Sequence, residues 1–181
     1  MQNTGIKLEK MEYNDVETVE SIYVEAFPEK ERKPFSIILA HNESGAGSVL
    51  KIVLDGKICG FFFTFFFRDL AMVDYFAIHK DYRNRGIGEL ALRLLREEYC
   101  DRKIFLEIED PDSGEMAARR LGFYRRCGFS RVGTYVKLFS VDMELLVLGD
   151  FEVDFKTYFD LYVSMLGKRR AERNVIERII K

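Results

Sequence analysis

The chain has 181 residues, of which 48% are hydrophobic and 32% are charged, a composition typical of a globular protein that buries its own core. A formal net charge of -2 at pH 7 argues against nucleic-acid binding through bulk positive charge, so no nucleic-acid partner is expected. The longest apolar run, residues 58–67, is about half of the roughly 20 residues that a membrane helix needs, and the first residues carry no apolar signal-peptide core; we therefore expect a cytoplasmic protein with no membrane partner.

The first elements in chain order are expected to be a strand and two helices. Residues 6–13 alternate between apolar and polar side chains, which predicts a strand. A helix then begins at a cap formed by Asp15 or the residue before it, and it ends at Pro28. The charged segment 28–34 is expected to be a solvated loop, and residues 35–40 predict a second helix.

Three consecutive strands are expected next. The dipeptide Asp55-Gly56 is a favoured two-residue hairpin turn between two strand-like runs. In the second run, residues 58–67, apolar residues do not alternate with polar ones, so both faces of this strand should be covered by helices. A third strand is expected over about residues 71–78.

The second half of the chain alternates between helices and strands. A helix is expected over about residues 86–99, with Leu90, Leu94 and Leu95 on its inner side. Residues 103–109 predict a strand in which Phe105, Glu107 and Glu109 share one face, because side chains alternate across a strand. A further helix, ended by Gly128, and two strand-like runs whose connecting turn cannot be placed complete the series.

This order of elements predicts an α/β (α+β) fold, in which a mixed, mostly antiparallel central sheet is flanked by helices. Residues 1–149 contain all of these elements and are interpreted as one domain. Residues 150–181 combine an apolar stripe at helical spacing with a charged end, and they are interpreted as a C-terminal helical extension. This apolar stripe would pack either on the domain or on a partner, so the sequence leaves open whether the protein forms a homodimer.

The three cysteines, Cys59, Cys100 and Cys127, are odd in number and have neither metal-ligand nor CxxC spacing. We expect free, buried thiols and no metal site.

The segment YFAIHKDYRNRGIG, from Tyr75 to Gly88, leads from a strand into a helix through closely spaced glycines. A helix start has amide hydrogens without backbone partners and carries partial positive charge, so it favours an anion. This field contributes only about 0.3–1 kcal/mol at an exposed site. Arg83 and Arg85 would strengthen it, and glycine lets an anion approach the backbone closely. The segment therefore predicts a diphosphate site.

Residues 83–88, Arg-Asn-Arg-Gly-Ile-Gly, resemble the R/Q-x-x-G-x-G/A signature of the GCN5-related N-acetyltransferases (GNAT family). In that family the loop between the fourth strand and the third helix holds the pyrophosphate of acetyl-CoA. The preceding YFAIHKDY is similar to the fourth strand, and FYRRCGF, residues 123–129, resembles the fourth-helix segment F-Y-x-x-x-G-F. The resemblance covers roughly residues 6–148.

The resemblance implies the GNAT fold and an acetyl-CoA-dependent N-acetyltransferase that acts by direct transfer in a ternary complex. The acceptor would be a primary amine of a small molecule or peptide, which the sequence does not identify. Backbone groups of the fourth strand would bind the pantetheine arm, beside a fifth strand that splays away, and the Ile78 amide could stabilise charge on the thioester oxygen. The residues that the resemblance assigns to acetyl-CoA are Phe76, Ala77, Ile78, Arg83, Asn84, Arg85, Gly86, Ile87 and Gly88.

Two proton-handling residues are implied for the chemistry. Tyr124 matches the tyrosine that acts as the acid toward the leaving thiolate, and Glu107 resembles a glutamate that acts as the base through water. Glu109 and Asp74 are alternative bases. Many family members have an asparagine shortly after the fifth strand, whereas the segment EDPDSGEM has none.

A runner-up from a different class is a catalytically silent acyl-CoA-binding or regulatory module, in which the diphosphate loop persists without an acceptor site. Binding of acetyl-CoA without turnover on any amine would favour it. A third alternative, a nucleotide-binding interaction domain, predicts comparable binding of ATP and CoA.

Overall fold

The computed structural model describes residues 5–179, which form two compact units. The first unit comprises residues 5–66 and 73–100, and the second comprises residues 67–72 and the chain from 101 onward. The fold is α/β, with helices packed on mostly antiparallel strands, as the sequence predicts. Within residues 5–179, no helix combines the length and the apolar character needed to span a membrane.

The first unit contains the following strands, in their sequence order: β1 (Ile6–Lys10), β2 (Gly47–Leu54), β3 (Lys57–Phe67) except its last residue, and β4 (Leu70–Ile78) except its first three residues. The hairpin between β2 and β3 has the predicted turn, in which Asp55 and Gly56 both have positive φ, 49° and 78°. β1 and β2 pair antiparallel, as do β2 and β3. The helices of this unit are α1 (Val16–Ala26), α2 (Phe35–Ser44) and α3 (Ile87–Glu98).

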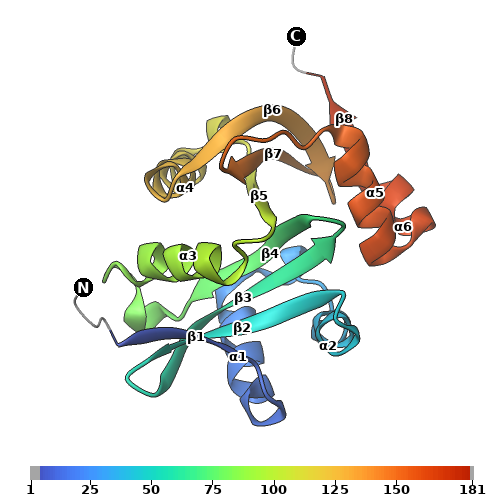
Figure 1. Cartoon of the computed structure of the whole chain (residues 1–181). Helices are drawn as coiled ribbons and strands as arrows, with labels where there is room; N and C mark the ends of the chain where they lie inside the picture. Colours follow the sequence, from blue (N-terminus) through green and yellow to red (C-terminus); the bar gives the residue numbers. More distant parts are fainter. Residues whose placement is uncertain (1–4, 180–181) are drawn as a thin grey trace. The chain divides into compact units, whose positions relative to one another are not determined.

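Strand β3 is covered on both faces by these helices, as its apolar sequence predicts. On one face Phe61 contacts Tyr23 of α1, with ring centroids 6.2 Å apart, and Phe65 contacts His41 of α2 at 4.9 Å. On the other face Phe66 contacts Tyr99, the residue that ends α3, at 5.4 Å. Figure 1 shows α3 on the opposite side of these strands from α1 and α2.

The second unit has the strand order β5-β7-β6-β8, with antiparallel pairing throughout. Its strands are β5 (Lys103–Glu109), β6 (Phe129–Leu138), β7 (Val141–Leu148) and β8 (Val175–Arg178). Its helices are α4 (Glu115–Arg126), α5 (Phe155–Leu166) and α6 (Lys168–Asn174). The turn between β6 and β7 consists of Phe139 and Ser140, both with positive φ.

The C-terminal segment contains a strand that the sequence pattern did not indicate. Besides α5 and α6, residues 175–178 form β8 and pair with β6, so that Leu138 lies opposite Val175 and Tyr135 lies opposite Arg178. The short run is charged on both sides and resembles the end of a helix. Its strand conformation is fixed by pairing with β6, a tertiary contact that local propensity does not report.

Two smaller expectations need correction. The inner side of α3 is formed by Ile87, Ala91, Leu92 and Leu95, whereas Leu90 and Leu94 are only half-buried. The three cysteines are free thiols as predicted, but only Cys59 is buried, because Cys100 is exposed and Cys127 is half-buried.

Candidate functional site

The predicted anion-binding loop leads from the end of β4 into α3. It begins with a short 3-10 turn, Lys80–Tyr82, and continues through Asn84 and Gly86, which have positive φ of 61° and 74°. The Gly86 carbonyl accepts the first bond of the helix, from the Leu90 amide at 3.2 Å. The amides before Leu90 in α3 therefore precede the regular helical bonds and can bind an external acceptor. A Cβ placed on Gly86 would meet no atom within 4 Å, so the space over this backbone is open to a ligand.

Arg83 is folded back onto the protein. Its Nε donates to the Ile78 carbonyl at 2.8 Å, and its Nη2 lies 3.7 Å from a carboxylate oxygen of Glu25 on α1. Glu25 also accepts the Lys80 amide at 3.1 Å and lies 3.2 Å from the Lys80 ammonium. Desolvation raises the pKa of Glu25, whereas the hydrogen bonds from Lys80 and the charge of His79 lower it. The lowering effects are together larger, so the pKa of Glu25 lies below its ordinary value. Glu25 thus offsets part of the positive charge of the loop.

Arg85 has a different environment. Its guanidinium carbon lies 5.7 Å from the centre of the Tyr82 ring, a cation–π arrangement that restricts the side chain without neutralising it. Within the part of the chain that the structure describes, Arg85 forms no ion pair. Of the two predicted arginines, Arg85 is therefore the one whose charge remains available to an anion.

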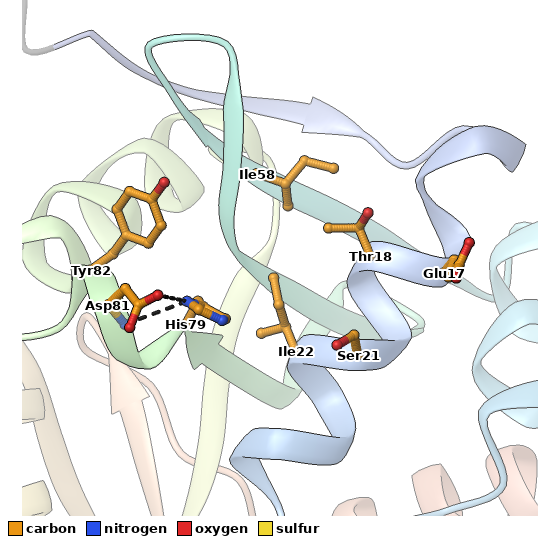
Figure 2. A pocket seen from close by; sticks show the side chains of 8 residues that line it. All are labelled: Glu17, Thr18, Ser21, Ile22, Ile58, His79, Asp81 and Tyr82. Carbon is orange, nitrogen blue, oxygen red and sulfur yellow. Dashed lines mark hydrogen bonds and ion pairs between the residues drawn. The ribbon is translucent and has the colours of Figure 1, made fainter.

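A hollow of about 440 Å³ lies between α1 and the segment after β4 (Figure 2). Its lining is formed by Glu17, Thr18, Ser21, Ile22, Ile58, His79, Asp81 and Tyr82. Figure 2 shows that His79 and Asp81 face each other there, with Nδ1 of His79 3.7 Å from Oδ2 of Asp81. Because two carboxylates line the hollow and neither Arg83 nor Arg85 does, it is poorly suited to a diphosphate.

Asp74, one of the alternative bases, is paired with a lysine. Both of its oxygens bind the Lys33 ammonium, at 2.6 and 2.7 Å, and its side chain is only 3% exposed. The Tyr75 hydroxyl accepts from the Lys33 amide at 3.1 Å and donates to the Glu31 carbonyl at 3.0 Å. Segment 28–34 is therefore tied down at Lys33, and the expectation of a solvated loop is wrong there.

Glu109, the other alternative base, is also paired with a cation. It lies at the end of β5 and forms an ion pair and hydrogen bond with Arg120 of α4, the helix that carries Tyr124. This pair links the strand to the helix.

Glu107 binds two tyrosine hydroxyls. One carboxylate oxygen, Oε2, accepts the Tyr158 hydroxyl, and the other, Oε1, accepts the Tyr162 hydroxyl at 2.8 Å. Both tyrosines lie on α5, four residues apart on one face of the helix, with ring centroids separated by 4.9 Å. Sequence reasoning missed them because they belong to a stripe that is otherwise apolar. The signal that could have found them in the sequence is that two rings of the stripe carry hydroxyl groups.

Tyr124 lies near the end of α4 and is 9% exposed. Its ring packs against Phe123 and Phe129, with centroids 5.2 and 5.5 Å away. Burial raises the pKa of Tyr124 to about 12. Because this pKa lies far above neutral pH, the hydroxyl is protonated. Among residues 5–179 it forms no hydrogen bond, so it is able to donate one to a ligand.

Comparison with known proteins decides the family. Residues 16–129 match the Acetyltransferase (GNAT) family. This chain belongs to the GNAT family. The matched segment includes the loop before α3, Glu107 and Tyr124, and the family's members are acetyltransferases, so the protein is an enzyme of that class. No curated protein matches the chain in sequence.

Solved structures with this fold include a protein from Bacteroides thetaiotaomicron assigned to the GNAT family. It is 27% identical, has a TM-score of 0.79, and the match covers 90% of this chain and 99% of that one. A ribosomal-protein alanine N-acetyltransferase from Escherichia coli has 18% identity, a TM-score of 0.60 and coverage of 81% and 96%. A spermidine N-acetyltransferase from Vibrio cholerae has 16% identity, a TM-score of 0.63 and coverage of 80% and 94%.

Proposed function

We propose that this GNAT enzyme transfers the acetyl group of acetyl-CoA to a primary amine by direct attack in a ternary complex. The observation that carries the proposal is the open, glycine-started N-terminus of α3 with Arg85 beside it. The space over Gly86 is open, since no protein atom lies within 4 Å of the position a Cβ would take. Backbone groups of Phe76, Ala77 and Ile78 would bind the pantetheine arm.

Within this loop we assign different tasks to the residues. The amides of Ile87 and Gly88 and the side chain of Arg85 bind the diphosphate, while Asn84 supplies the turn with its positive φ. Arg83 holds the loop against β4 through the Ile78 carbonyl, so its contribution to the ligand is mainly through geometry.

Glu107 is the proposed base. It is half-buried and accepts the hydroxyls of Tyr158 and Tyr162, whereas Asp74 binds Lys33 and Glu109 binds Arg120. Because Glu107 is also the residue that the family resemblance assigns to the base, we give it the task of taking a proton, through water, from the acceptor ammonium.

Acetyl transfer exchanges one bond and removes two protons from the acceptor nitrogen. The acceptor ammonium loses a proton toward Glu107, the neutral nitrogen attacks the thioester carbon, and the new C–N bond replaces the C–S bond. The nitrogen then loses a second proton. One of the two protons ends on the CoA sulfur and the other in solvent. The products are an acetylated amine and free CoA.

Tyr124 is proposed to act on the leaving sulfur. A free thiol side chain has a pKa of about 8.5, well below the pKa of about 12 to which burial raises Tyr124. Complete proton transfer from the hydroxyl to the thiolate would therefore be uphill. A hydrogen bond that strengthens as negative charge develops on sulfur is the role that fits this hydroxyl.

The acceptor remains open within the class of primary amines. Two of the proteins with this fold are named for spermidine and for a ribosomal-protein alanine, which differ greatly in size. Cytoplasmic location and assembly as a homodimer also stay predictions. In the apolar stripe of α5 that suggested self-association, Tyr158 and Tyr162 are 0% exposed, whereas the other members are half-buried: Phe155, Phe159, Val163 and Leu166.

Two measurements test the proposal together. Calorimetric titration with acetyl-CoA reports binding, and CoA release over a panel of spermidine, lysine, kanamycin and an alanine-starting peptide reports turnover, with mass spectrometry of the products. We expect binding and acetylation of at least one amine. Tight binding without any turnover would instead support a silent acyl-CoA-binding module. Comparable competition by ATP and CoA would support a nucleotide-binding domain.

A further inference from the structure

The buried face of α5 presents polar groups to a single acidic side chain. Tyr158 and Tyr162, called here the tyrosine pair, are both 0% exposed, and buried hydroxyls require hydrogen-bond partners. Each hydroxyl donates to Glu107, and each donates to a different carboxylate oxygen. The two hydroxyls therefore engage the two oxygens of one carboxyl group.

We propose that the tyrosine pair positions Glu107 for catalysis, so that the C-terminal segment is part of the machinery of acetyl transfer. This inference rests on the proposed function of Glu107 as the base. A single bond would leave the carboxylate free to rotate about its last torsion, which is broad in glutamate. Donors on both oxygens fix the plane of the group, and a base acts efficiently only when it is held in reach of its proton.

The position of α5 does not depend on the two hydroxyls. Its N-terminus is capped by Asp154, whose Oδ1 accepts the Thr157 amide at 2.8 Å. Just before the helix, the Val153 carbonyl accepts from the Thr134 hydroxyl of β6 at 2.7 Å. The helix also buries Leu161 and Met165. Removing a hydroxyl while keeping the ring should therefore leave the helix in place.

The C-terminal end of the segment is attached separately. β8 pairs with β6 along its length, and Arg178 binds Asp110 at 2.9 Å, just after β5. With α5 held at its start by β6 and followed by a strand on the same sheet, the tyrosine pair is presented to β5 by a supported element. Preorganisation of this kind is what a positioning residue requires.

The test is a mutant cycle on turnover. The variants are Tyr158→Phe, Tyr162→Phe, these two changes combined, and Glu107→Gln, and each tyrosine variant, the double variant included, is also made in the Glu107→Gln background. Turnover is measured with acetyl-CoA and the panel amine that wild type acetylates fastest. The control Tyr135→Phe removes a tyrosine hydroxyl of the same unit that accepts only a 3.5 Å bond from Arg131. Urea denaturation gives the free energy of unfolding of each variant.

We expect Tyr158→Phe combined with Tyr162→Phe to lower kcat by about tenfold to a hundredfold, as removal of groups that orient a reactive side chain does, with little change in the KM for acetyl-CoA. In the Glu107→Gln background the same changes should alter kcat by less than about twofold, because the residues act as one unit. The control should resemble wild type.

Three outcomes would overturn the inference. Unchanged kcat in the Tyr158→Phe, Tyr162→Phe double variant, with wild-type turnover intact, would show that the hydroxyls do not position Glu107 for catalysis, and the proposed function would stand. If the losses in kcat from the tyrosine changes add fully to the loss in kcat from Glu107→Gln, the tyrosine pair acts independently of the carboxylate. Absence of wild-type turnover on the whole panel would overturn the proposed function, and the positioning role with it.

Discussion

The two units of the molecule carry their functional groups in contrasting ways. In the first unit the candidate diphosphate site is made mainly of backbone from one continuous segment, residues 79–88, with Gly86 at the start of α3. In the second unit Glu107 depends on hydroxyls that lie 51 and 55 residues further along the chain. The comparison teaches that a site built from local backbone is visible in a short motif, whereas a site built from distant side chains is not.

The largest expected effect is on turnover in the second unit. Tyr124→Phe should lower kcat by about 10²-fold to 10³-fold, because the hydrogen bond to the charge that develops on the leaving sulfur is removed, while the affinity for acetyl-CoA changes little. Steady-state kinetics and calorimetric titration measure the two quantities separately. Tyr135→Phe is the matched control. Turnover equal to wild type would remove Tyr124 from the mechanism.

The next effect concerns binding in the first unit. Gly86→Leu should weaken acetyl-CoA binding by at least about a hundredfold, because the side chain would occupy the open space where the diphosphate meets the backbone. Gly45→Leu is a close control, because Gly45 has the same φ of 74° and its Cβ would also meet no atom within 4 Å. Both variants carry the same backbone strain. Retained affinity in Gly86→Leu would mean that the loop is only structural.

A third prediction concerns Asp74, for which we expect a role in stability and not in catalysis. Asp74→Asn should lower the free energy of unfolding by about 3 kcal/mol, because it removes the carboxylate charge from a pair with Lys33 whose side chains are only 3% and 10% exposed. The control Asp69→Asn breaks an exposed pair with Lys103, whose side chains are 54% and 59% exposed, and should cost less than about 1 kcal/mol. Urea denaturation measures both.

The same Asp74 variant also tests the choice of base. Its kcat, corrected for the folded fraction, should stay near that of wild type, whereas Glu107→Gln should lose about 10²-fold or more. If Asp74→Asn lost turnover to that extent while Glu107→Gln did not, Asp74 would replace Glu107 as the base.

The smallest effect distinguishes the two arginines of the loop. Arg85→Ala should weaken acetyl-CoA binding by about fivefold to tenfold and make it less sensitive to salt, since one exposed charge contact to phosphate is lost. Arg83→Ala should have a smaller effect on affinity, because that guanidinium is engaged with Ile78 and Glu25. Isothermal titration at low and high salt tests the order, and a larger loss in Arg83→Ala would reverse our assignment.

Most of the fold could be predicted because its signals are local. The Asp55-Gly56 turn, the uninterrupted apolar run of β3 and the glycines before α3 each report a backbone conformation directly. The turn between β6 and β7 could not be placed, because Phe139 and Ser140 adopt positive φ without the glycine or asparagine that usually marks such a turn. β8 was missed because its conformation depends on pairing with β6.

The candidate site follows the same division. The loop and Tyr124 lie in short motifs that a single sequence displays. The partners that distinguish the three candidate bases, Lys33 for Asp74, Arg120 for Glu109 and the tyrosine pair for Glu107, are brought together only by folding. Sequence alternation placed Glu107 and Glu109 on one face of β5, but it could not tell which of them would meet a cation.

A crystal structure of the protein with acetyl-CoA tests the central claim most directly. The account predicts diphosphate oxygens within hydrogen-bonding distance of the amides of Ile87 and Gly88, with Arg85 turned toward them. A diphosphate bound elsewhere, for instance in the hollow lined by Glu17 and Asp81, would contradict it.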